Sequence, residues 1–412
     1  MIGFGSDSQT QPSTVEATKH RHAHDVMARP CFSRTAHLRS GEQVSYSEIG
    51  DKKGYPVLWF AGPCSNRLLM AIYEDMAIEF GLYIICFDRP GRGASTPLRH
   101  PKLWEFRSLA AYANELMTIL GIEKFFIIGH SIGASYALAC YDTIKHRVLG
   151  PLRFLATWAP SNLPCMPVSY ALQRSLPTRM LRGVYSMGYS TAMMNLSSSS
   201  TVPSQMGAIG SREAINTRDR FVHQVLERVN EDHIGDAYKA FEIDWLLALE
   251  INKPFGFDHR TLQCAVKCWH GMDDTVSPLG AAMWMQREMK QFLLYAVEGA
   301  THNILLDFAI VRAIFADISK EAAMILVKPI IETDDPKAAT VSAADATSDL
   351  DSRPPTPISL PGSEISRRDL DAQQQIPTPA TTPTGGDVFS SDTTSLATAH
   401  SMDPTENVWE TS

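Results

Sequence analysis

The chain has 412 residues, 44% of them hydrophobic, and a formal net charge of −8. This length suits one α/β domain of roughly 250–300 residues with appendages, and the acidic charge argues against a nucleic-acid partner. The acidity is concentrated at the end of the chain, where residues 332–412 carry 14 acidic and 4 basic side chains. The part before residue 332 is therefore close to neutral.

The chain begins with a polar stretch, residues 1–30, in which His20, His22 and His24 alternate with other residues. We interpret it as a solvated, disordered leader rather than a metal-binding tract, because no second cluster of ligands accompanies it. It lacks the basic and apolar segments of a secretory signal, and no apolar run in the chain approaches the ~20 residues that cross a bilayer. Residues 35–50 alternate and turn at Gly41, which predicts an antiparallel hairpin at a sheet edge.

After this hairpin, short and nearly continuous apolar runs alternate with helix-length stretches. Such runs are typical of strands buried on both faces of a parallel sheet. The runs lie at residues 57–60, 82–87, 125–128, 155–158, 264–269 and 292–297. The helices are expected at residues 67–79, 103–120, 132–145, 278–290 and 303–320. The alternation predicts a doubly wound α/β fold.

Two stretches depart from the alternation. Residues 159–258 hold no convincing strand but helical pieces at 212–230 and 233–252, which predicts an inserted helical lid over the carboxyl edge of the sheet. Residues 332–412 are rich in Ser, Thr, Pro, Asp and Ala, and we expect a disordered acidic tail. The predicted core is then formed by the remaining parts of the chain, residues 31–158 and 259–331.

The most informative motif joins the apolar run at 125–128 to the helix expected at 132–145. Gly129-His130-Ser131-Ile132-Gly133 is a G-x-S-x-G sequence between a strand and a helix, the context of a nucleophile elbow. A serine is a weak nucleophile and must be held on a sharp turn, where a base reaches its hydroxyl group and backbone N–H groups face the oxyanion. We therefore predict that Ser131 is a nucleophile.

The partners of such a serine are expected later in the chain, an acid first and a histidine last. The run at 264–269 leads into Asp273 and Asp274, and the run at 292–297 leads into His302. His302 would take the serine proton through one ring nitrogen while a carboxylate accepts a hydrogen bond from the other nitrogen. Asp273 and Asp274 both remain candidates for that carboxylate.

These motifs resemble the α/β-hydrolase superfamily, in its branch of lidded serine hydrolases with G-H-S-x-G elbows, over roughly residues 35–325. The resemblance implies a mostly parallel twisted sheet with flanking helices and a helical lid. In this family the acid is third after the glycine of an H-G-x-x-D segment, which His270-Gly271-Met-Asp273-Asp274 matches at Asp274. The segment Asp88-Arg89-Pro90-Gly91-Arg92-Gly93-Ala94-Ser95 matches a family turn that is mainly structural.

The resemblance also implies two N–H donors for an oxyanion. The first is Ile132, just after the serine. The second belongs to the turn after the run at 57–60, where the family has His-Gly and this chain has Ala61-Gly62-Pro63-Cys64. Since proline has no N–H, the second donor is expected at Cys64, or at Ser65 if the turn is shifted by one residue.

The motifs predict a serine hydrolase for an ester, thioester or related acyl bond, with a partly apolar small-molecule substrate and no cofactor or metal. An acyltransferase, a C–C bond hydrolase and a non-catalytic α/β-hydrolase-like scaffold remain alternatives, and the tail could bind a protein partner. The seven cysteines are irregularly spaced, several of them in apolar runs. This pattern predicts free thiols in a reducing, cytoplasmic compartment.

Overall fold

The computed structural model describes residues 22–181, 212–231, 237–251, 253–327 and 363–364. The chain divides into two units, Met1–Ile365 and Ser366–Ser412, and every described residue belongs to the first. Most of the predicted leader and tail, and part of the predicted lid, lie outside the described residues.

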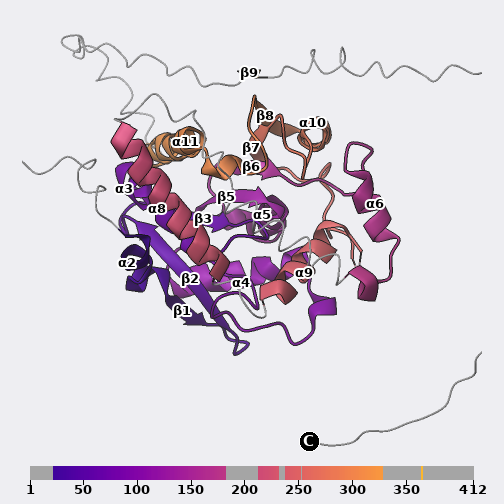
Figure 1. Ribbon diagram of the computed structural model, residues 1–412, viewed down its shortest axis with the longest axis horizontal. Coiled ribbons are helices and arrows are strands. Elements are labelled where there is room, and N and C mark those ends of the chain that lie inside the picture. The colour runs from indigo at the N-terminus through magenta and orange to yellow at the C-terminus, as the bar shows by residue number, and fades with distance from the viewer. Residues whose placement is uncertain (1–21, 182–211, 232–236, 252, 328–362, 365–412) are drawn as a thin grey trace, which may run out of the picture. The chain divides into compact units, whose positions relative to one another are not determined.

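Within the described residues, nine strands form one sheet in the order β1-β2-β4-β3-β5-β6-β7-β8-β9 (Figure 1). The six central strands, β4-β3-β5-β6-β7-β8, pair in parallel with their neighbours. At one edge β1 pairs antiparallel with β2 and β2 with β4, and at the other edge β9 pairs antiparallel with β8. The strands are β1 Arg34–His37, β2 Gln43–Gly50, β3 Tyr55–Phe60, β4 Leu82–Phe87, β5 Phe126–Ser131, β6 Leu152–Thr157, β7 Ala265–Gly271, β8 Gln291–Val297 and β9 Ser363–Glu364. The predicted parallel strands and the edge hairpin are confirmed.

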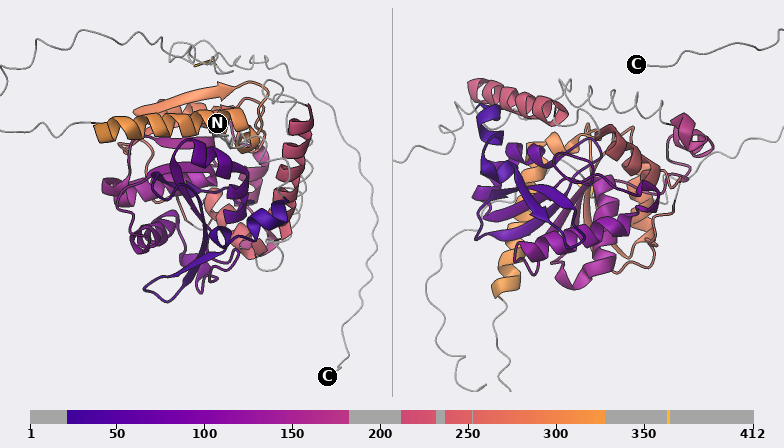
Figure 2. Two further views of the ribbon diagram at one scale, coloured as in Figure 1. Left: turned by 90° about the vertical axis from the view of Figure 1, so that its left-hand side faces the viewer. Right: turned by 90° about the horizontal axis from the view of Figure 1, so that it is seen from below.

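Helices cover both faces of the sheet (Figure 2). Side chains of α4 (Phe106–Ile119), α5 (Ile132–Ile144) and α10 (Leu279–Glu288) share one apolar cluster with one face. The other face packs against the 3₁₀ helix η3 (Arg67–Tyr73), α3 (Glu74–Glu79) and α11 (Phe308–Val327). Strands β4, β5 and β6 are buried at every position because both of their faces are covered. The fold is the predicted one, with helices on both faces of a mostly parallel sheet.

The described parts of the predicted insertion, residues 159–258, contain helices joined by turns and no strand. Its helices are α6 (Val168–Arg174), α8 (Arg212–Glu231) and α9 (Ala237–Ala248). Helix α6 was not among the expected helices. The structure places α8 against η3 and α2 (Ala23–Met27), with Val222, Val225 and Val229 buried.

Two short elements lie where the sequence predicts disorder. In the leader, Ala23, Val26 and Met27 of α2 are buried, because this short helix packs on α8. In the tail, β9 pairs with β8 at Tyr295 and Ala296. An edge strand offers unpaired backbone groups to any segment that reaches it. The rest of the predicted leader and tail lies outside the described residues, and their disorder stays a prediction.

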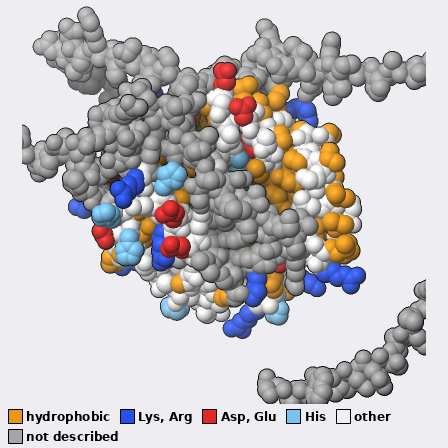
Figure 3. Space-filling model, in the orientation of Figure 1, with side chains coloured by type: hydrophobic (Ala, Val, Ile, Leu, Met, Phe, Trp, Pro, Cys, Tyr) orange, Lys and Arg blue, Asp and Glu red, His pale blue; other side chains and the backbone are white. Residues whose placement is uncertain are grey.

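Hydrophobic side chains gather on the side of the molecule where α6 and α10 lie (Figure 3). On α6, Val168 is 85% exposed and Leu172 is 62% exposed. No helix among the described residues is both long and apolar enough to span a membrane. All seven cysteines are free thiols, as their irregular spacing predicts.

Candidate active site

The site is built around the sharp turn from β5 into α5. Ser131 has φ 57° and ψ −129°, a left-handed conformation that is strained for a residue with a side chain. The two flanking glycines allow this turn to pack closely. A Cβ atom on Gly133 would lie 2.1 Å from the carbonyl oxygen of Phe60, and one on Gly129 would lie 2.8 Å from Cα of Ala134. The G-x-S-x-G spacing therefore reflects backbone contacts on both sides of the serine.

The structure brings Ser131, His302 and Asp274 together from three different loops. Ser131 Oγ lies 2.9 Å from His302 Nε2, and His302 Nδ1 lies 2.7 Å from Asp274 Oδ2. His302 follows β8, Asp274 follows β7 and Ser131 ends β5, all at the carboxyl edge of the sheet. A serine hydroxyl, an imidazole and a carboxylate in this order can pass a proton from oxygen to nitrogen.

Asp274, rather than Asp273, is the carboxylate that reaches the histidine. Its Oδ1 accepts hydrogen bonds from the backbone N–H groups of Val276 and Ser277, at 2.9 and 2.8 Å. Burial by itself would raise the pKa of Asp274, but the nearby His302 ring and the hydrogen bonds it receives lower it. The side chain of Asp273 is exposed. Asp274 is therefore held as a charged acceptor.

Two further histidines support this arrangement. The Nε2 of His130 donates to the carbonyl oxygen of His302 at 3.1 Å, and burial beside His302 lowers the pKa of His130 to about 3. His270 is buried at the end of β7, where its Nε2 donates to the carbonyl oxygen of Ser277 at 2.7 Å. Both rings are therefore attached to the backbone of the loops that carry His302 and Asp274.

The turn after β3 approaches the serine at Gly62. A Cβ atom on Gly62 would lie 2.6 Å from Nδ1 of His130 and 3.5 Å from Cβ of Ser131. The N–H of Ser65 donates to the carbonyl oxygen of Gly62 at 3.2 Å, so it closes the turn and does not serve as a free donor. Burial raises the pKa of the Cys64 thiol to about 12, which keeps it protonated. Sequence reasoning overlooked Gly62, although a glycine beside a proline after a strand marks a place where backbones approach closely.

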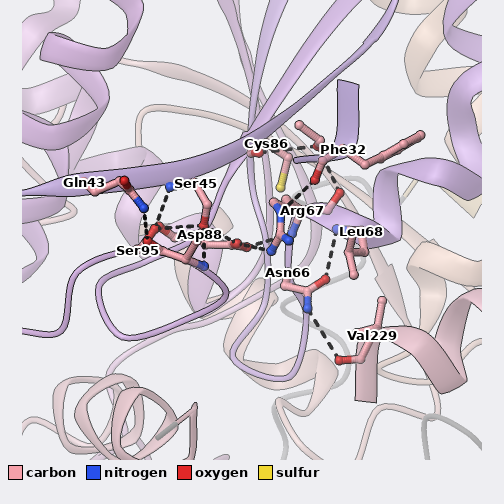
Figure 4. A network of polar contacts seen from close by, with 12 residues as sticks. Phe32, Gln43, Ser45, Asn66, Arg67, Leu68, Cys86, Asp88, Ser95 and Val229 are labelled. Carbon is pink, nitrogen blue, oxygen red and sulfur yellow. Dashed lines mark hydrogen bonds and ion pairs between the residues drawn. The ribbon is translucent and has the colours of Figure 1, made fainter. Parts of the chain in front are cut away.

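The far end of this turn is anchored by the Asp88 carboxylate (Figure 4). Asp88 accepts hydrogen bonds from the backbone N–H and the guanidinium group of Arg67, at 2.9 and 2.5 Å, and from Ser45 Oγ at 2.7 Å. The guanidinium group also donates to the carbonyl oxygen of Phe32 at 2.8 Å. Asn66 donates to the carbonyl oxygen of Val229, at 3.5 Å, so α8 contacts the same turn. Asp88 thus has the structural role expected of this motif.

The described residues include no group of three His, Cys, Asp or Glu side chains arranged to hold a metal ion. His22 and His24 lie beside a surface cavity with Asp25 and residues of α8. The remaining histidine of the tract, His20, lies outside the described residues.

Comparison with known proteins agrees with this fold. A family model for the alpha/beta hydrolase fold matches residues 71–151. A proline iminopeptidase from Lactiplantibacillus plantarum is 28% identical over 102 residues, which are 24% of this chain and 36% of that protein. A probable proline iminopeptidase from Leptolyngbya boryana is 30% identical over 110 residues, 26% and 33% of the two chains. The chain thus spans about a third of the length of these curated relatives.

Similarity to solved structures extends over most of the described chain. A thermophilic esterase from Thermogutta terrifontis and an esterase from Exiguobacterium antarcticum each superpose with a TM-score of 0.51 at 16% identity. Each comparison covers 70% of this chain and 99% of the other. A sharp turn that carries a serine between a strand and a helix, in a sheet with this order of strands, is characteristic of the α/β-hydrolase fold. The chain has the α/β-hydrolase fold.

Proposed function

We propose that this protein is a serine hydrolase that cleaves an ester, thioester or related acyl bond through an acyl-Ser131 intermediate. The proposal is carried by the 2.9 Å distance between Ser131 Oγ and His302 Nε2, at a serine whose backbone is held in the left-handed region. Strain of this kind persists only where the surrounding structure imposes it, and it is common at catalytic serines on such turns.

The reaction follows from the geometry of the three side chains. His302 Nε2 accepts the proton of Ser131 Oγ while this oxygen attacks the carbonyl carbon of the substrate. Asp274 accepts the hydrogen bond from the other ring nitrogen and stabilises the imidazolium ion. When the bond to the leaving group breaks, His302 returns the proton to that group and an ester remains on Ser131. A water molecule, deprotonated by His302, then releases the acid and restores the serine.

The oxyanion formed in both steps requires N–H donors. Ile132 is the first residue of α5, and the first N–H groups of a helix have no acceptor within the helix. For the second donor, the approach of Gly62 to Ser131 favours the N–H of Gly62 over that of Cys64. Loss of one such donor typically lowers the rate by about 10²–10³-fold.

A partly apolar acyl group fits the surroundings of the turn. Cys64 packs with Leu181, Phe241 and Leu246, which the insertion contributes. This contact supports a role for the insertion as a lid that covers the substrate. Acyl transfer and C–C bond cleavage use the same three side chains and remain alternatives within this class of enzyme. The local similarity to proline iminopeptidases adds an aminoacyl amide to the substrates worth testing.

The test is labelling with a fluorophosphonate probe, followed by hydrolysis assays on p-nitrophenyl acetate, butyrate and octanoate and on L-prolyl-p-nitroanilide. We expect the wild-type protein to label at one site and the Ser131→Ala variant not to label. Ser135→Ala, on the next turn of α5, is the matched control and should label normally. A folded wild-type protein that neither labels nor hydrolyses any of these substrates would support the non-catalytic scaffold instead.

A further inference from the structure

One buried guanidinium group is bound to the turn that faces Ser131. Arg89 follows β4, and its Nη1 and Nη2 atoms donate to the consecutive carbonyl oxygens of Ala61 and Gly62, at 2.6 and 2.8 Å. Arg89 is 5% exposed. Two donors from one planar group fix the orientation of both peptide groups, which a single flexible contact would not do.

The orientation of Arg89 depends in turn on the insertion. Asp244 of α9 accepts a hydrogen bond from Nε of Arg89 at 2.9 Å. The same carboxylate accepts hydrogen bonds from Arg92 at 3.0 Å and from the hydroxyl group of Tyr136 at 2.9 Å. Tyr136 lies on α5, the helix that begins after Ser131. Asp244 is buried, so this carboxylate connects α9, the loop after β4 and the elbow helix without intervening solvent.

We infer that Arg89 and Asp244 are positioning residues that couple helix α9 of the insertion to the oxyanion-binding turn. The inference rests on the proposed function. In a trans peptide, the N–H points opposite to the C=O, so the hydrogen bond from Arg89 to the Ala61 carbonyl fixes the direction of the Gly62 N–H. A cation on the carbonyl oxygen also polarises the peptide and strengthens that N–H as a donor. Asp244 holds the guanidinium plane in the orientation that reaches both carbonyls.

The consequence is that the turn is competent only while α9 is docked. If α9 moves away, Arg89 loses the Nε partner that orients it, and the Gly62 peptide is free to rotate. A misplacement of about 1 Å in a catalytic group can cost roughly 10²-fold in rate. Docking of the insertion therefore does more than enclose the substrate, because it also sets the geometry of the second oxyanion donor.

The test compares Arg89→Lys and Asp244→Asn with the wild-type enzyme on the best p-nitrophenyl ester. A lysine keeps the charge but cannot reach both carbonyls in one plane, and an asparagine keeps the shape but loses the charge that orients Arg89. We expect kcat to fall by roughly 10–100-fold while KM changes by less than about threefold. Affinity for a trifluoromethyl ketone, whose adduct with Ser131 carries an oxyanion, should fall by the same factor as kcat.

Arg153→Lys is the matched control, because Arg153 is also a buried arginine held by carboxylates, those of Asp317 and Glu321 on α11. It should lower the melting temperature and leave kcat unchanged. If Asp244→Asn does not fold, Tyr136→Phe removes one hydrogen bond from the same carboxylate and should lower kcat with KM unchanged.

Three outcomes would overturn the inference. In the first, Arg89→Lys and Asp244→Asn fold and keep the wild-type kcat while Ser131→Ala is inactive, which leaves the proposed function intact. In the second, only KM changes, which assigns the pair to substrate binding. In the third, the wild-type protein itself neither labels nor hydrolyses, and the proposed function fails together with the coupling.

Discussion

His130 donates a hydrogen bond to the backbone carbonyl oxygen of His302, across 3.1 Å and 172 positions in the chain. The residue next to the serine thereby holds the loop that carries His302, the proposed base. Because the carbonyl oxygen can only accept, the proton of His130 lies on Nε2. Its Nδ1 atom faces Gly62. The ring thus lies between the loop of His302 and the turn at Gly62.

The first prediction concerns this ring. His130→Ala should lower kcat by roughly 10-fold or more, because the His302 loop loses its attachment. His130→Gln offers an amide N–H at a similar reach and should restore most of the activity. Since burial lowers the pKa of His130 to about 3, the ring is neutral near neutral pH. The pH at which activity falls in acid should therefore be the same in His130→Gln and in the wild type, and a shifted profile would contradict this role.

The second prediction separates the two adjacent aspartates. Asp274→Asn should lower kcat/KM by roughly 10⁴-fold, because His302 loses the acceptor that fixes its tautomer. Asp273→Asn, the matched control, should stay within about twofold of the wild type, since its side chain is exposed. Steady-state kinetics on one ester measures both. Equal losses in the two variants would mean that the acid has been misassigned.

The third prediction concerns the elbow itself. Gly133→Ala should destabilise the protein by about 3 kcal/mol or prevent folding, because the new Cβ would meet the carbonyl oxygen of Phe60 at 2.1 Å. Gly41→Ala is the control. Unlike Gly133, Gly41 has a positive φ, +92°, and no atom lies within 4 Å of the new Cβ, so only about 1 kcal/mol of backbone strain is expected. Thermal unfolding followed by circular dichroism distinguishes the two.

The fourth prediction concerns stability in acid. His259 is buried among Phe255, Phe257 and Trp284, and burial lowers its pKa from 6.5 to about 4. A histidine whose folded pKa is lowered takes up its proton more readily when unfolded, so stability is lost as the pH falls below 6.5. Between pH 7 and pH 5 this histidine should account for about 2 kcal/mol of the lost stability.

The variant His259→Phe should reduce that loss, as measured by urea unfolding at the two pH values. His130 contributes with the same sign, because burial lowers its pKa as well. The control is His146→Phe, an exposed position that should leave the pH dependence unchanged. An identical loss in the wild type and in His259→Phe would contradict the prediction.

Features that are local in the sequence were predicted well. The buried parallel strands were predicted from continuous apolar runs. The turn at Ser131 was predicted from its two flanking glycines, which allow the backbone to pack closely there. The order of Asp274 and His302 was readable because each follows a strand at the same edge of the sheet. Their proximity to Ser131 is what the structure adds, while their catalytic role stays a prediction.

Features that depend on tertiary contacts were missed. Helix α2 has five residues, and a helix this short has little stability of its own, so its sequence carries no signal until α8 packs on it. The approach of Gly62 to the serine depends on how two loops pack, which a count of residues along a family pattern does not reveal. The expected donor at Cys64 stays a prediction. The contact between Arg89 and Asp244 joins residues 155 positions apart, and no local pattern indicates it.

Helix α2 also has a practical consequence for producing the protein. Ala23, Val26 and Met27 cover apolar side chains of α8, and the neighbouring Phe32 accepts a hydrogen bond from Arg67 through its carbonyl oxygen. A recombinant form that begins after residue 33 would leave these apolar surfaces open to water and prone to aggregation. Affinity tags and protease sites should therefore be placed before residue 22, although the polar composition of residues 1–30 would suggest that any position within them is suitable.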